Sequence, residues 1–135
     1  MATNTKTLYD ATFIVDGVPV DWNTEVEITI SHDADTVQTD SGNITTNNRN
    51  PGAQFSITRH TRFETDKENA IIDAITQLSY KNGGVVTFMV TEPNGTFVVN
   101  GYGTIPDERS WSHSTGELME NSIDLVSESY EEYFL

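Results

Sequence analysis

Four short stretches of the sequence contain residues whose types and spacing could do chemistry. His32, Asp33 and Asp35 offer an imidazole and two carboxylates, which are possible ligands for a divalent metal ion. No second cluster of ligands follows to complete a coordination shell, and acidic residues are common in turns because they bond their own backbone. The pattern favours a turn over a metal site, so we expect neither a metal nor another cofactor.

The remaining stretches lack the partners that catalysis needs. A Ser-His-Ser triplet at 112–114 has no nucleophile elbow around it and no evident carboxylate to orient the histidine. The glycine pair at 83–84 lacks the following helix and the lysine of a phosphate-binding loop. Glu25 and Glu27 lie two apart on one strand, which is typical of a solvated strand face. The sequence predicts that this protein is not an enzyme.

Composition excludes several classes of protein. The 135 residues carry a net charge of −14, and tight binding of DNA needs clustered Lys and Arg. There is no cysteine for a disulfide or a thiolate. No apolar run approaches the ~20 residues of a membrane span, so we expect no membrane partner. The first residues lack the basic and apolar regions of a secretory signal, so we expect synthesis in the cytoplasm.

One helix is predicted, at about residues 66–81, and the strands must be arranged around it. Thr65 and Glu68 have the spacing of a capping box, and the glycines at 83–84 can end the helix. Apolar residues recur at helical spacing and form one stripe, which must pack on a sheet. These helix-to-sheet packing residues are Ile71, Ala74, Ile75 and Leu78.

The rest of the chain predicts strands. Asp16-Gly17 and Asn94-Gly95 mark two hairpins. Residues 24–30 alternate between apolar and acidic or polar, whereas the run at 85–91 is nearly all apolar and is typical of a central strand covered on both faces. Residues 105–109 interrupt the pattern, and a last strand is expected at about 117–127.

Two segments leave alternatives open. The polar stretch at about 31–52 is either an extended arm built for another surface or a mobile loop. The acidic and aromatic end, 128–135, is either docked on a neighbour or exposed and disordered. The pattern as a whole predicts one domain, 1–135. We expect it to be a mainly β, antiparallel sandwich or flattened barrel of seven or eight strands with one flanking helix.

The order of motifs resembles the small tail tube proteins of contractile-tailed bacteriophages. GNIT at 42–45, NNR at 47–49 and Gly52 precede a strand, the helix, the glycine pair at 83–84 and the second hairpin. The family's early Asn-Gly-Val turn stands here as Asp16-Gly17-Val18. The likeness covers roughly residues 10–127, and the segment 128–135 has no counterpart in it.

The resemblance implies a virion protein of the tail, made in the host cytoplasm, that closes into homohexameric rings. The rings would stack into a tube that contacts sheath, baseplate and tape-measure proteins, and DNA would pass through without specific binding. Six subunits that each lend about four strands would make a bore near ~38 Å. Candidates to line it are Glu25, Glu27 and Thr29, unless they lie on the outer wall; candidates for the subunit interface are Asn47, Asn48 and Arg49.

Two other functions fit the same observations. A tail-completion or baseplate ring protein would share the fold and form single rings. A non-catalytic carbohydrate-binding sandwich would also be acidic and rich in hairpins. In that case Trp22, Tyr102 and Trp111 would form an exposed stacking platform, whereas the alternative places these aromatic residues in the core or an interface.

Overall fold

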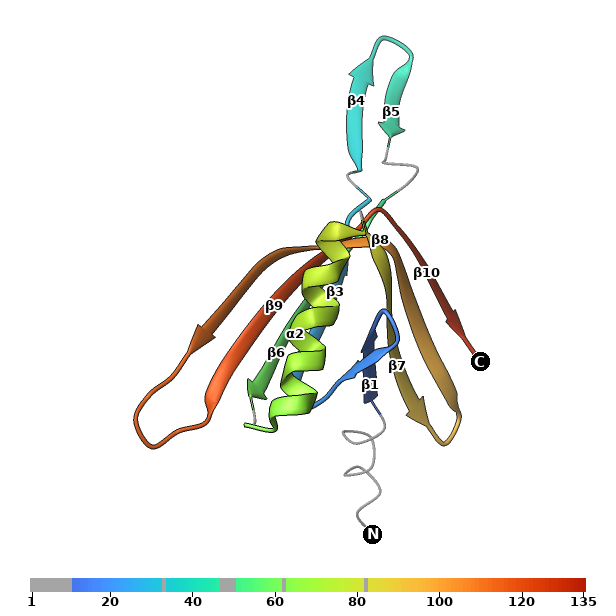
Figure 1. The fold of residues 1–135 in the computed structure, drawn as a ribbon. Coiled ribbons are helices and arrows are strands. Elements are labelled where there is room, and N and C mark those ends of the chain that lie inside the picture. Colours follow the sequence, from blue (N-terminus) through green and yellow to red (C-terminus); the bar gives the residue numbers. More distant parts are fainter. Residues whose placement is uncertain (1–10, 33, 47–50, 62, 82) are drawn as a thin grey trace.

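The computed structural model describes residues 11–32, 34–46, 51–61, 63–81 and 83–135. Along these residues the chain is mainly β, with one helix (Figure 1). The elements are β1 (Ala11–Val15), β2 (Val18–Val20), β3 (Asn23–Ile30), β4 (Asp35–Thr39), β5 (Gly42–Thr46), β6 (Ala53–Thr61), α2 (Thr65–Tyr80), β7 (Gly84–Glu92), β8 (Gly95–Ser112), β9 (Met119–Ser127) and β10 (Ser129–Phe134).

The long strand β8 divides the main sheet into two leaves. Its first half, residues 95–104, pairs with β7 and β10, and its second half, residues 105–112, pairs with β9. We call the group of β2, β1, β7, the first half of β8 and β10 leaf A. The second half of β8 with β9, β6 and β3 is leaf B. All pairings are antiparallel, and the eight-stranded sheet bends into an open, flattened sandwich (Figure 1). The predicted sandwich is confirmed, and the sheet is not closed into a barrel.

The bend in β8 depends on glycines and a bulge. Gly103 has a φ of +62°, and a Cβ added at Gly101 would lie 2.7 Å from a ring carbon of Phe55. The register shifts between Pro106 and Glu108, so the extra residue is absorbed without ending the strand. The expectation that residues 105–109 interrupt the strand was therefore wrong. A bulge accommodates the proline within a continuous strand.

The helix α2 covers the open side between the two leaves (Figure 1). It contacts β1, β2 and β8. The four residues of the apolar stripe are buried in one cluster with side chains from both leaves. This cluster is Phe13, Val15, Val20, Ala53, Phe55, Ile57, Ile71, Ala74, Ile75, Leu78, Val86, Val99, Ile123 and Leu125. Because the helix exposes its other face, most of its stabilisation comes from this one contact.

The capping box at the start of α2 is absent. The N-cap residue is Glu64, and it makes no side-chain capping bond. Glu68 instead receives two hydrogen bonds from the guanidinium of Arg59, at 2.8 and 2.9 Å. Arg59 comes from the inner side of β6 and is 1% exposed, and its Nε donates to the carbonyl of Asp21. A buried ion pair thus links helix to sheet, and its carboxylate is not free to cap the helix.

The turns follow the sequence closely. Asp16 (φ +48°) and Gly17 (φ +87°) form the two-residue turn between β1 and β2. Gly83 (φ +112°) follows the helix, and its amide donates to the carbonyl of Leu78. Lys81 at the helix end then binds the carboxylate of Asp16 at 2.8 Å. The first hairpin and the end of the helix are held together at one corner.

Two further expectations need correction. β7 is central, between β1 and β8, but it is not covered on both faces, because Val85 is 42% exposed. The segment after β9 has regular structure, so the alternative of a disordered end is wrong. It forms β10, in register with residues 97–102 of β8. The exposure of β7 and the formation of β10 both depend on which strands pair with them. The local composition of a segment does not determine its pairing partner.

The described part of the polar arm is a two-stranded hairpin that projects from one end of the body (Figure 1). All residues of β4 and β5 are exposed, including the cross-strand pair of Val37 and Ile44. An isolated hairpin is marginally stable in water. Among the described residues, no helix is long and apolar enough to cross a membrane.

Candidate functional site

The residues that suggested chemistry do not assemble into a reactive centre within the described chain. No group of three or more His, Cys, Asp or Glu side chains there is arranged to hold a metal ion. Asp33, one of the three proposed ligands, lies outside the described residues. Gly83 caps the helix, and β7 begins at Gly84, so the pair forms no phosphate cradle.

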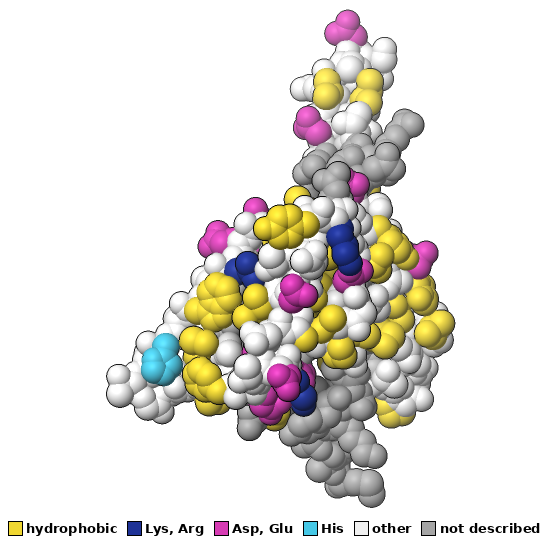
Figure 2. Space-filling model, viewed as in Figure 1, with side chains coloured by type: hydrophobic (Ala, Val, Ile, Leu, Met, Phe, Trp, Pro, Cys, Tyr) yellow, Lys and Arg dark blue, Asp and Glu magenta, His cyan; other side chains and the backbone are white. Residues whose placement is uncertain are grey.

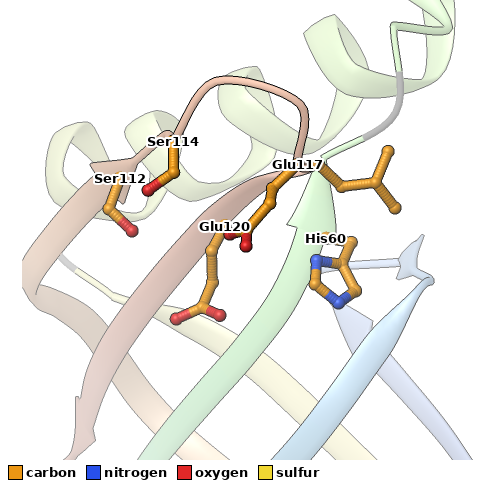
Figure 3. Close-up of a pocket in the computed structure, with 6 residues that line it drawn as sticks. His60, Ser112, Ser114, Glu117 and Glu120 are labelled. Carbon is orange, nitrogen blue, oxygen red and sulfur yellow. The ribbon is translucent and has the colours of Figure 1, made fainter.

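A hollow of about 320 Å³ lies at the end of leaf B, where β6, β8 and β9 meet (Figure 3). Its histidine is His60, and His113 of the Ser-His-Ser triplet is not part of the lining. The Nδ1 atom of His60 is buried and bonds to no group of the described chain. Nucleophilic catalysis needs a hydrogen bond between nucleophile and base. This hollow therefore lacks the geometry of a catalytic triad. Its lining is His60, Ser112, Ser114, Glu117, Leu118 and Glu120.

The outer face of leaf B is the most distinctive polar surface of the described chain. On β3, Val26, Ile28 and Ile30 pack against the core, so Glu25, Glu27 and Thr29 point away from it and are exposed. The same alternation runs through β6 and β9, whose inner residues are buried. Cross-strand register then joins the outer residues of all four strands into one face.

We call this surface the acidic face, and it holds carboxylates without a balancing cation. Within the described strands of leaf B, no Lys or Arg lies on it. Arg59 on β6 and Arg109 on β8 pair with buried residues of β9. Their side chains therefore lie on the inner side of leaf B, opposite the acidic face. The acidic face consists of Glu25, Glu27, Thr29, Gln54, Ser56, Thr58, His60, Ile105, Glu108, Ser110, Ser112, Glu120, Ser122, Asp124 and Val126.

Leaf B has a free edge on each side. β3 pairs only with β6, and the second half of β8 pairs only with β9, because β7 reaches no farther than Thr104. A free strand edge presents backbone N–H and C=O groups that can pair with another strand. Leaf B is therefore a four-stranded element that another copy could extend at either edge.

Three consecutive polar residues are the sequence-predicted candidates for the subunit interface. Asn47, Asn48 and Arg49 lie outside the described residues. They follow β5 directly in the sequence. Their role at a subunit interface remains a prediction.

The three aromatic residues of the alternative carbohydrate site do not form one platform. Trp22, Tyr102 and Trp111 are each exposed by a third to a half. Tyr102 lies at the bend of β8, and Trp111 lies nine residues farther along the same strand. Residues in a strand rise ~3.3 Å each, which separates these two rings by more than ~20 Å. A shared stacking surface is excluded by this spacing.

Sequence reasoning missed two features of leaf B. The sequence does indicate the Arg59–Glu68 pair, because an arginine at an inner strand position needs a carboxylate partner. No sequence pattern indicates the free edge at residues 105–112, because this edge depends on where β7 ends. Arg109 and Trp111 stack on this edge, with the guanidinium carbon 5.7 Å from the ring centroid.

No family model and no curated protein matches this sequence. Solved structures do match its fold. The tube-terminating cap of the anti-feeding prophage is 13% identical, with a TM-score of 0.70 over 94% of this chain and 89% of that chain. The sheath-tube complex of the extracellular contractile injection system PVC is 15% identical, with a TM-score of 0.68 over 95% and 90%.

A third neighbour is the tail of the empty gene transfer agent particle, described with C6 symmetry. It is 15% identical and has a TM-score of 0.62 over 94% of this chain and 96% of that chain. At such low identity the likeness establishes the fold. The chain has the tail tube fold that the order of its motifs resembles.

Proposed function

We propose that this chain is a non-catalytic, structural subunit of a tail tube, which closes into hexameric rings that stack. The observation that carries the proposal is leaf B, with two free edges and one face on which all side chains but Ile105 and Val126 are acidic or polar. A sheet closed on itself has no edges left to aggregate. Closure through copies of leaf B would satisfy both edges at once.

The strand directions of leaf B permit this closure. Its four strands run alternately, so β3 and the second half of β8 point in opposite directions. When β3 of one copy lies beside β8 of the next, the new pair is antiparallel, like every other pair in the sheet. Identical copies can therefore extend the sheet head to tail without a parallel junction, and rotation closes such a heterologous contact into a ring.

The size of such a ring suits the passage of DNA. Six copies follow the six-fold symmetry of the tail described above. With ~24 strands at ~4.8 Å, tilted by ~40°, the backbone diameter is ~48 Å and the bore after side chains is ~38 Å. The acidic face would line this bore, since the opposite face is the core. Carboxylates repel phosphates, so DNA would pass without being held by counterion release.

The remaining surfaces fit an assembly inside a particle tail. The projecting hairpin β4–β5 extends beyond the body, where stacked rings would meet (Figure 1). Sheath, baseplate and tape-measure proteins are the partners of such a tube, and the protein would be part of a virion after synthesis in the host cytoplasm. DNA is cargo in this assignment and is not a bound partner.

A second candidate is a ring that ends the tube. The likeness to a tube-terminating cap, with a TM-score of 0.70, is at least as high as that to the sheath-tube complex. A terminator would share the ring and the acidic face, and it would not stack on itself.

Negative-stain electron microscopy of the purified protein over a range of concentrations tests both candidates. Stacked rings or tubes of variable length support the tube subunit, and single rings of one thickness support the terminator. Protein that stays monomeric at every concentration, with no ring in any field, refutes a ring-forming subunit of either kind.

A further inference from the structure

Within the described part of this acidic protein, Arg109 is a cation without a carboxylate partner. The described residues form three ion pairs, Arg59–Glu68, Lys67–Glu64 and Lys81–Asp16, and Arg109 takes part in none of them. Its guanidinium stacks on Trp111. Stacking uses the face of the guanidinium and leaves the N–H groups at its rim free to bind a planar carboxylate.

The surroundings of Arg109 are apolar and uncovered. Arg109 and Trp111 pair with Ile123 and Asn121, whose side chains are buried, so both lie on the inner side of β8. Trp111 is nevertheless 47% exposed and Leu118, next to β9, is 60% exposed. Figure 2 shows hydrophobic side chains beside the helix on the side where β8 ends and β9 begins. An inner surface that its own chain leaves open is a candidate contact for another molecule.

The outer face of leaf A carries an apolar surface that is a candidate partner for Arg109 and Trp111. Met89, Val98 and Tyr133 lie in one cross-strand row on the side away from the core, and Val98 is only 2% exposed there. Tyr133 is 37% exposed. This row supplies the apolar part of a candidate contact surface.

A carboxylate lies at the margin of that row. Glu131 is exposed on β10, two residues from Tyr133 and on the same face. Its carboxylate accepts a long hydrogen bond, 3.4 Å, from Asn100, and it is in none of the ion pairs of the described residues. Leaf A therefore presents an apolar patch with a negative charge, and leaf B presents an aromatic ring with a positive charge.

Ring closure through the free edges brings these two surfaces together. Leaf A lies beyond β3, on the same side of leaf B as α2 (Figure 1). A copy whose β3 pairs with β8 of the next copy therefore carries its leaf A over the inner side of that β8. The outer face of leaf A then turns toward Arg109 and Trp111 of the neighbour.

We propose that Arg109 and Trp111 of one copy bind the outer face of leaf A of the adjacent copy, with the guanidinium of Arg109 paired to the carboxylate of Glu131. The inference rests on the ring proposed above and assigns its second subunit contact. It gives the segment 128–135, which has no counterpart in the motif pattern, a role as an intersubunit strand. Opposite charges across the contact fix its register and disfavour wrong partners.

Charge reversal tests the pairing. Arg109→Glu and Glu131→Arg should each raise the protein concentration needed for half-maximal ring formation by more than about tenfold, and the double variant should recover most of that loss. Lys67→Glu is the matched control, because it reverses an exposed cation on the helix. Sedimentation velocity measures the assembly, and circular dichroism melts check that each subunit folds.

A cysteine pair provides the second measurement, since the chain contains no cysteine. In a ring of the variant Trp111→Cys/Tyr133→Cys, oxidation should link neighbouring copies into a ladder on a denaturing gel. Rings that form equally well with Arg109→Glu, a double reversal that fails to recover assembly, or a missing ladder in intact rings would each overturn the contact and leave the ring itself standing. A parent protein that forms no ring removes both proposals.

Discussion

Glu68→Ala should be one of the most destabilising single changes outside the apolar core. The variant leaves the guanidinium of Arg59, 1% exposed, without its carboxylate; among the described residues, it keeps only the bond to the carbonyl of Asp21. Removal of one partner of a buried ion pair costs about 3–5 kcal/mol. With a urea m-value near ~2 kcal/mol/M, the midpoint of unfolding should fall by about 1.5–2.5 M.

Two variants separate this effect from ordinary loss of charge. Lys67→Ala removes an exposed helix pair, whose lysine side chain is 66% exposed, and should cost less than about 0.5 kcal/mol. The double variant Arg59→Met/Glu68→Leu replaces the pair by apolar groups and should recover most of the lost stability. Urea melts on dissociated subunits, with unchanged m, give these numbers. A midpoint for Glu68→Ala that matches that of Lys67→Ala would refute the reasoning.

Three other expected outcomes follow from the same structure. Leu78→Ala should lower the free energy of unfolding by about 2–5 kcal/mol, because its side chain is fully buried under α2, and a loss below about half a kcal/mol in denaturant melts would contradict that packing. Arg49→Ala should weaken assembly by about 2–5 kcal/mol if this residue pairs across an interface, and sedimentation that matches the parent would exclude that role. Glu25→Lys/Glu27→Lys should give rings that retain DNA at low salt and release it as salt rises, whereas the parent rings should not retain it; equal retention in a filter-binding assay would show that these residues do not face the bore.

The local patterns that were predicted correctly each depend on a short period. The stripe from Ile71 to Leu78 repeats at the pitch of a helix, and Val26, Ile28 and Ile30 alternate as a strand must when one face is wet. Asp16-Gly17 forms its turn because both residues accept positive φ. Each of these patterns spans only a few residues, so it can be recognised in the sequence without knowledge of the fold.

The features that were missed depend on residues far apart in sequence. Glu68 does not form the capping box, because its carboxylate pairs with the buried guanidinium of Arg59, nine residues earlier. Pro106 suggested a break, but pairing with β9 carries β8 past it through a bulge. The acidic face could be predicted on β3 alone. Its extension over four strands, and the free edge at residues 105–112, required the topology.

A cryo-electron microscopy reconstruction of the assembled protein tests the central claim most directly. We expect a six-fold ring in which β3 of each copy pairs antiparallel with residues 105–112 of the next. The carboxylates of Glu25 and Glu27 should face a central opening wider than a DNA duplex. A ring with these glutamates on its outer wall, a lumen lined by Lys and Arg, or a particle with no central opening would contradict the account.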